Sequence, residues 1–201
     1  DPEVLHAIHK GLQPEEVQRA VTLLQQEGLR VMGFFIIGLP GASLRSALGT
    51  IQFERALPLD DRSYNAFVPY PCPAGYRWAL EHGRFLGDHR DALHFSDREE
   101  TVFETDDYPE AQRKAALVLA RMGTKELADE DFGLMRDLLL TGVDLYNAVV
   151  HVFSTMGTGG FSTLSRSVEG FRSGATELVI TLFMLIAGTN FALHFLALRT
   201  R

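Results

Sequence analysis

Cysteine is nearly absent from the 201-residue sequence, which contains a single thiol at Cys72. One cysteine excludes an internal disulfide framework and any multi-cysteine metal site formed by this chain alone. A net positive charge is also absent, since the formal net charge is −7, and this argues against nucleic acid as a partner. The chain starts at Asp1 with no initiator methionine and no signal peptide, so we expect a fragment or an excised piece.

Charged side chains are missing from one long segment near the C-terminal end. Residues 178–198 form a run of 21 without Asp, Glu, Lys or Arg, which is long enough to cross hydrocarbon at about 1.5 Å per residue. Residues 1–133 carry 14 basic and 22 acidic side chains, net −8, whereas residues 134–201 carry 5 and 4, net +1. The sequence therefore predicts a soluble first part and a membrane-embedded second part.

An unbroken apolar run at residues 31–37 predicts a buried strand covered on both faces. Apolar residues at helical spacing predict a helix over residues 14–27 before it and another after Ser43, which indicates an α/β fold. A second strand, parallel to the first, is predicted at residues 64–68, and a helix at 109–122 closes this part.

The turn after the first predicted strand is the natural ligand contact, because ligands of open α/β sheets lie beyond the carboxyl ends of the strands. Its residues are Gly38, Leu39, Pro40 and Gly41. The alternative is a simple tight turn between a strand and a helix, for which these residue types are common.

Four pieces in order carry a family resemblance: Leu-His-Ala-Ile-His-Lys-Gly at residues 5–11, Glu-Gly-Leu at 27–29, residues 33–41, and Val-Pro-Tyr-Pro at 68–71. Together, residues 1–122 resemble the later half of a radical S-adenosylmethionine domain, most like the cobalamin-associated branch. The resemblance implies a partial (β/α) barrel, with S-adenosylmethionine bound in part by the backbone of Gly38, Leu39, Pro40 and Gly41.

The same resemblance implies a [4Fe–4S] cluster and, for that branch, cobalamin. The cysteine triplet that binds the cluster in the family would precede Asp1 and is absent from this sequence. We therefore assign no catalytic residue and expect no radical activity from the chain alone.

Three other features contain residue types able to bind metals or act as nucleophiles. His6 and His9 share a helix face but have no third ligand beside them, which favours solvated histidines. Residues 82–108 contain three histidines and many acids at spacings that fit no ligand template, which favours a solvated surface segment. Cys72 has no neighbouring His or Lys to activate it, which favours an incidental thiol. We predict no metal site.

Residues 123–141 are predicted to form an acidic linker. After it, residues 144–156 predict an amphipathic helix that runs into a glycine-rich loop and then the long uncharged segment. The loop is no phosphate-binding loop, because no Gly-Lys-Ser/Thr follows. A short helix, an irregular loop and a spanning segment form the order of a re-entrant pore loop, whose backbone lines water; a flexible turn is the alternative.

Residues 151–163 and 183–195 resemble the pore helix with its filter, and the inner helix, of one repeat of the Trk/Ktr potassium-transporter family. The resemblance covers residues 142–201 and implies K⁺ as ligand, bound by carbonyls of Thr158, Gly159 and Gly160 next to Phe161. It implies an all-α membrane part, made of a re-entrant pore helix plus one transmembrane helix, and further repeats that complete the pore.

We expect one spanning helix at residues 176–198, within which Asn190 and His194 face protein and not lipid. Arg199 and Arg201 follow it directly, which predicts a cytoplasmic C-terminal end. The whole chain is then a fragment that joins a radical S-adenosylmethionine-like enzyme half to a potassium-transporter repeat in the cytoplasmic membrane, with its soluble part in the cytoplasm. The alternative is a membrane-anchored α/β module with neither activity.

Overall fold

The computed structural model describes residues 1–71, 73–86, 101–122, 127–157 and 159–188. The chain divides into two compact units, Asp1–Lys125 and Glu126–Arg201. Each unit is described by itself below.

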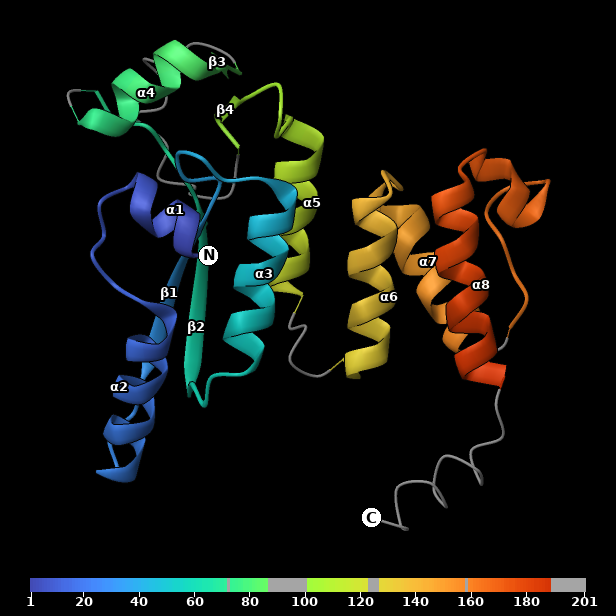
Figure 1. Ribbon diagram of the computed structural model, residues 1–201, viewed down its shortest axis with the longest axis horizontal. Helices are drawn as coiled ribbons and strands as arrows, with labels where there is room; N and C mark the ends of the chain where they lie inside the picture. The colour runs from blue at the N-terminus through green and yellow to red at the C-terminus, as the bar shows by residue number, and fades with distance from the viewer. Residues whose placement is uncertain (72, 87–100, 123–126, 158, 189–201) are drawn as a thin grey trace. The chain divides into compact units, whose positions relative to one another are not determined.

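The first unit is a mixed α/β structure built around a parallel strand pair (Figure 1). Strand β1 (Met32–Ile37) pairs with β2 (Asp61–Ala66) in parallel, with Met32 opposite Asp61 and Ile37 opposite Ala66. Its helices are α1 (Pro2–Ala7), α2 (Pro14–Gln26), α3 (Leu44–Arg55), α4 (Ala74–His82) and α5 (Glu110–Arg121). A second, antiparallel pair joins β3 (Arg84–Phe85) to β4 (Phe103–Glu104).

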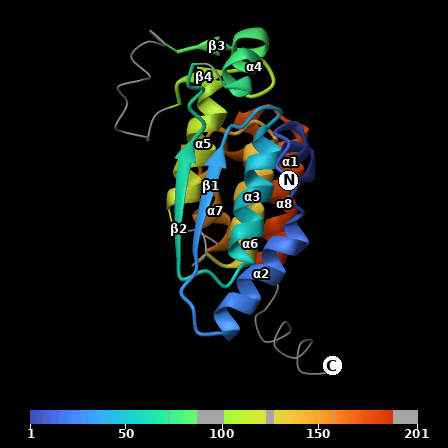
Figure 2. The same cartoon turned by 90° about the vertical axis from the view of Figure 1, so that its left-hand side faces the viewer.

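Helices α3 and α5 pack against the same face of the β1–β2 pair (Figures 1 and 2). The predicted helices and the first parallel strand of this unit are confirmed. The second strand exists and is parallel, but it covers Asp61–Ala66 where residues 64–68 were predicted. Pro14 occupies the first turn of α2, and the Ser43 hydroxyl accepts the Ser46 N–H at the start of α3. The described residues also contain α4 and the β3–β4 pair, which the sequence pattern did not indicate.

The prediction that β1 is covered on both faces is wrong for the described residues. The Phe34 side chain is 71% exposed and Ile36 is 46% exposed, whereas Phe35, which points the other way, stacks on Tyr64 at a ring-centroid distance of 5.0 Å. An unbroken apolar run specifies a strand but not the number of layers that cover it. Each sheet within the described residues has two strands, and no barrel is formed by them.

The second unit is helical, with α6 (Asp129–Leu140), α7 (Leu145–Met156), the short 3₁₀ helix η3 (Ser167–Phe171) and α8 (Gly174–Gly188). Helix α6 contacts both α7 and α8, and the three helices lie side by side (Figure 1). Their shared core contains Leu134, Met135, Leu138, Val152 and Ile180, each at most 1% exposed. The Thr176 hydroxyl of α8 donates to the Thr141 hydroxyl, at 3.0 Å, so a polar contact also joins these elements.

The predicted linker at residues 123–141 is wrong from Asp129 onward, because α6 begins there and buries Phe132 and Leu138. The acidic run that suggested a linker supplies the first turn of this helix. Negative side chains stabilise a helix N-terminus by opposing its dipole, so the same residues serve as a start signal. The predicted helix over residues 144–156 is confirmed as α7, capped by the Asp144 carboxylate, which accepts the Asn147 N–H.

Only part of the predicted spanning helix at residues 176–198 lies within the described residues. Helix α8 is described over the 15 residues Gly174–Gly188; residues 189–198, with Asn190 and His194, lie outside the described residues. In the part of the chain that the structure describes, none of the helices combines the length and the apolar character needed to span a membrane.

Candidate functional site

The glycine turn of the first unit follows β1 directly. Gly38 has a φ of +86° and Gly41 a φ of +75°, a region that side-chain-bearing residues rarely adopt. The Ala42 N–H donates to the Leu39 carbonyl at 2.9 Å, which closes the turn before α3 begins. The four residues predicted as the ligand contact therefore lie together at the carboxyl end of a parallel strand.

Arg113 of α5 holds this turn from inside the protein. Its side chain is buried, its Nη1 donates to the Gly38 carbonyl at 3.0 Å, and its Nε donates to the Tyr108 carbonyl at 2.7 Å. The guanidinium lies 4.3 Å from the centre of the Phe103 ring and 4.4 Å from that of Tyr108. Burial lowers the pKa of Arg113 to about 10, so the side chain is still charged at neutral pH.

Sequence reasoning missed Arg113. The available signal was its position on α5, one helical turn before the buried Ala116 and Leu117. A charged residue at a core position of an amphipathic helix indicates a structural or functional partner.

A cleft of about 500 Å³ lies beyond the carboxyl ends of β1 and β2. Leu39 and Pro40 line one part of it, and Phe67 and Trp78 line another. Cys72, in the following loop, lies outside the described residues. Leu39 and Pro40 bring the glycine turn to this cleft, whereas Gly38 and Leu39 line a second hollow of about 320 Å³ in the same unit.

Glu104 of β4 anchors the start of α5. Its carboxylate accepts the Glu110 N–H at 2.7 Å and pairs with Arg84, whose Nε donates at 2.6 Å. The Glu110 N–H first, and the Arg84 side chain second, lower the pKa of Glu104 below its ordinary value. A carboxylate with a lowered pKa in the folded state contributes stability above its unfolded pKa and loses that contribution as the pH falls.

We therefore expect Glu104→Gln to reduce the stability of the first unit at neutral pH and to flatten its loss of stability in acid, between about pH 5 and pH 3. Fluorescence of Trp78, the one tryptophan of the sequence, reports unfolding of this unit within the whole chain. The exposed Glu81 supplies the control Glu81→Gln, whose acid profile stays that of the parent. An acid profile of Glu104→Gln identical to the parent's contradicts the assignment.

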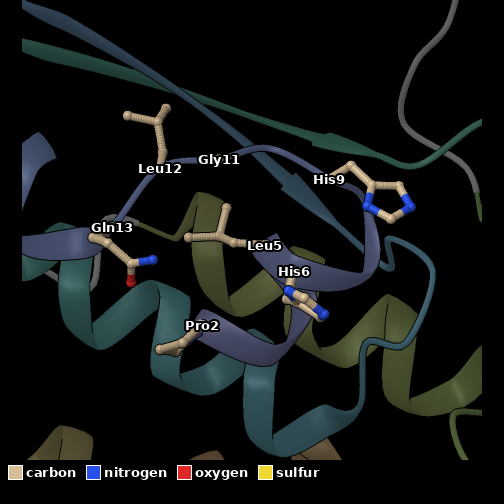
Figure 3. A pocket seen from close by; sticks show the side chains of 7 residues that line it. All are labelled: Pro2, Leu5, His6, His9, Gly11, Leu12 and Gln13. Atoms are coloured by element: carbon tan, nitrogen blue, oxygen red, sulfur yellow. The ribbon is translucent and has the colours of Figure 1, made fainter.

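His6 lies in α1, whereas His9 follows the end of that helix at a φ of +53°, so the prediction that the two histidines share a helix face is wrong (Figure 3). Both residues are exposed. They line a hollow of about 300 Å³ together with Leu5 and Gln13, and their ring centroids are 6.5 Å apart. Among the described residues there is no group of three or more His, Cys, Asp or Glu side chains able to hold a metal ion. Residues 87–100 of the predicted solvated segment at residues 82–108 lie outside the described residues. The prediction is wrong for residues 102–104 and for Tyr108, because Phe103 and Tyr108 are fully buried.

The predicted filter loop of the second unit begins where α7 ends, at Gly157. Thr158 lies outside the described residues. The Gly159 N–H donates to the Ser154 carbonyl at 2.7 Å, and Gly160 has a φ of +68° with no heavy atom within 4 Å of the point where a Cβ would lie. Gly159, Gly160 and Phe161 are exposed, so nothing in this unit covers the loop within the described residues.

Three residues of α7 bind the loop as it returns along the helix. Ser154 Oγ donates to the Phe161 carbonyl at 2.6 Å and accepts the Phe161 N–H at 2.7 Å. His151 Nε2 lies 3.1 Å from Ser162 Oγ, and the Thr163 hydroxyl donates to Asn147 Oδ1. These three residues were not singled out from the sequence, although their i, i+4, i+7 spacing places them on one helix face.

Comparison with known proteins connects the second unit to one family. Residues 127–201 match the TrkH family, described as a cation transport protein. The match begins at residue 127, so it includes α6, whereas the resemblance seen in the sequence began at residue 142.

Several individual relatives are Trk system potassium uptake proteins. The Trk system potassium uptake protein TrkH of Halomonas elongata is 43% identical over 63 residues, which are 31% of this chain and 13% of that protein. TrkH of Escherichia coli is 41% identical over 64 residues, 32% of this chain and 13% of the relative. TrkG of Escherichia coli is 39% identical over 59 residues, 29% of this chain and 12% of the relative. The chain thus spans about an eighth of the length of these relatives.

No solved structure matches the chain. The TrkH matches cover the transporter part of the prediction and nothing supports the radical S-adenosylmethionine part. The barrel, the S-adenosylmethionine, the iron–sulfur cluster and the cobalamin expected from that resemblance are therefore without support. A glycine turn after an apolar strand is common to many α/β folds. The short motifs between residues 5 and 71 are therefore not specific to the radical S-adenosylmethionine family.

Proposed function

We propose that residues 127–201 form one pore-loop repeat of a TrkH-type potassium transporter. In this repeat, carbonyl oxygens of Thr158, Gly159 and Gly160, with Phe161 beside them, replace part of the hydration shell of K⁺. The observation that carries the proposal is the family match, which covers a helix, a glycine-rich loop and a second helix in the order a re-entrant pore loop requires.

The chemistry of the loop fits this role. Glycines expose backbone carbonyls without side chains between them and an ion, and Gly160 adopts a φ that favours glycine. Ser154 pairs both backbone polar groups of Phe161, so this residue needs no neighbouring strand. Such a loop can remain ordered at membrane depth when it lines water.

The partners that follow from the proposal are K⁺, membrane lipid and the further repeats that close a pore. We place this part in the cytoplasmic membrane and the C-terminal end of the chain in the cytoplasm, because Arg199 and Arg201 end the sequence after the uncharged run. This orientation puts the filter loop toward the outer side.

The test is a segment exchange, because one repeat alone makes no pore. Residues 127–201 replace the matching segment of Escherichia coli TrkH, and K⁺ uptake is measured in cells that lack their own uptake systems. We expect uptake to be retained within a few-fold. A reporter that is active only in the cytoplasm, attached after Arg201, checks orientation in the same cells. A well-expressed, inserted exchange protein without uptake, next to an active parent, contradicts the proposal.

For residues 1–122 we propose only a ligand contact at Gly38, Leu39, Pro40 and Gly41. Support comes from the position of this turn at the carboxyl end of β1 and from the adjoining cleft of about 500 Å³. The alternative is an α/β module without ligand or activity. Heat-induced unfolding followed by Trp78 fluorescence, with and without S-adenosylmethionine as the probe, tests the contact for this one compound, because a ligand that binds the folded state raises the unfolding temperature.

A further inference from the structure

Three successive residues of the loop are bound by three residues of α7 in reverse order. Phe161 is held by Ser154, Ser162 by His151, and Thr163 by Asn147. We call this set of contacts the α7 ladder. It fixes the stretch of chain that directly follows Gly160, and so it restricts where the preceding carbonyls can lie.

His151 is the buried contact of the ladder. Its side chain is 2% exposed, and its ring meets Phe171 of η3 at a centroid distance of 4.9 Å in an edge-to-face arrangement. Its Nδ1 lies 2.8 Å from the Asn147 carbonyl and its Nε2 lies 3.1 Å from Ser162 Oγ. Both ring nitrogens are therefore engaged, one with the helix and one with the loop.

When the His151 ring is neutral, its contact with the Asn147 carbonyl determines which ring nitrogen carries the proton. A carbonyl oxygen only accepts, so Nδ1 carries the proton and donates to the Asn147 carbonyl. Nε2 is then an acceptor, and the Ser162 hydroxyl donates to it. The same hydroxyl oxygen accepts the Leu164 N–H at 3.1 Å. A directed series of hydrogen bonds thus runs from Leu164 through Ser162 and His151 to α7.

We propose that His151 is a positioning residue that holds the filter loop on α7 through Ser162, and that this contact sets the preference for K⁺ over Na⁺. A carbonyl filter selects K⁺ over Na⁺ through the carbonyl oxygens that replace the hydration shell of the ion. The consequence for ion selectivity rests on the proposed function, whereas the tautomer and the hydrogen-bond series stand without it.

Two substitutions of similar chemistry separate positioning from simple packing. His151→Gln places an amide at the distance of Nε2 and restores a contact to Ser162. His151→Asn has a shorter side chain, which reaches the helix side only. Both replace the ring by an uncharged amide, so loss of packing against Phe171 is common to the two variants.

The first measurement uses the whole 201-residue chain in detergent micelles. Nitrogen-15 NMR of the histidines is expected to show His151 with a protonated Nδ1 and an unprotonated Nε2. Exchange of the Leu164 amide hydrogen is expected to quicken about tenfold in His151→Asn and to stay near the parent rate in His151→Gln. A protonated Nε2 in the neutral ring, or equal exchange in both variants, overturns the hydrogen-bond series.

The second measurement uses the segment-exchange transporter. The ratio of K⁺ to Na⁺ uptake is expected to fall about tenfold in His151→Asn and to be retained in His151→Gln. Equal ratios in the parent and in His151→Asn overturn the positioning role while leaving the transport function intact. Absence of uptake in the exchange protein with His151 unchanged is a failure of the proposed function instead, and the NMR result then stands by itself.

Discussion

Gly160→Val is expected to lower K⁺ uptake by the segment-exchange transporter at least about tenfold. A branched side chain at a φ of +68° costs about 1–3 kcal/mol of backbone strain, and a carbonyl filter relieves that strain by rotating its peptide groups away from the ion. About 1.4 kcal/mol in ion binding is already a tenfold change. Initial rates of K⁺ uptake, corrected for the amount of inserted protein, provide the measurement.

Gly142→Val is the matched control for this change. Gly142 also has a positive φ, +91°, and open space where a side chain would lie, but it follows α6 and lies outside the filter loop. Equal loss of uptake in the two variants would point to folding of the unit and not to the filter. Full uptake in Gly160→Val would remove Gly160 from the filter.

Gly38→Ala is expected to destabilise the first unit by about 3–5 kcal/mol. A methyl group at Gly38 would overlap with Nη1 of Arg113, and the positive φ adds strain. Moving Nη1 of Arg113 away would remove the Gly38 carbonyl, one of the acceptors of this buried charge, which is the more costly part of the change. Chemical unfolding of the whole chain, followed by Trp78 fluorescence, measures the free energy of unfolding for this unit.

Gly28→Ala is the control that measures backbone strain without steric overlap with Arg113. Gly28 has a similar φ of +75° and nothing within 4 Å of the added methyl group, so we expect a loss of only about 1–2 kcal/mol. The difference between the two variants reports the Arg113 contact. Equal losses at Gly28 and Gly38 would contradict the role of Arg113 in holding the turn.

Elements with strong local signals were predictable from the sequence. Helix α2 has Pro14 at its start and apolar residues at helical spacing, and α7 has the capping residue Asp144. The parallel pairing of β1 and β2 followed from a strand, a helix and a strand in order. In each case the information lies within a few residues of the element that it specifies.

The parts that were missed depend on contacts between distant residues. The acids at the start of α6 resemble a solvated linker until Phe132 and Leu138 are seen to be buried. Arg113 and His151 are buried polar residues within helices. Arg113 is paired with Gly38, which is distant in the sequence, and His151 is paired with Ser162 in the loop that follows its helix. Residue type gives no sign of such partners, because most polar helix residues face water.

The exposed apolar side chains of helix α8 determine how the chain behaves during purification. Thr176 and Ile180 are its buried residues, whereas Leu178 and Leu185 are 70% and 66% exposed. Contiguous apolar surface of this kind drives self-association in water. We therefore expect the chain in a mild detergent to elute as a single sharp peak in size-exclusion chromatography. Dilution of the detergent below its critical micelle concentration is expected to make the protein aggregate.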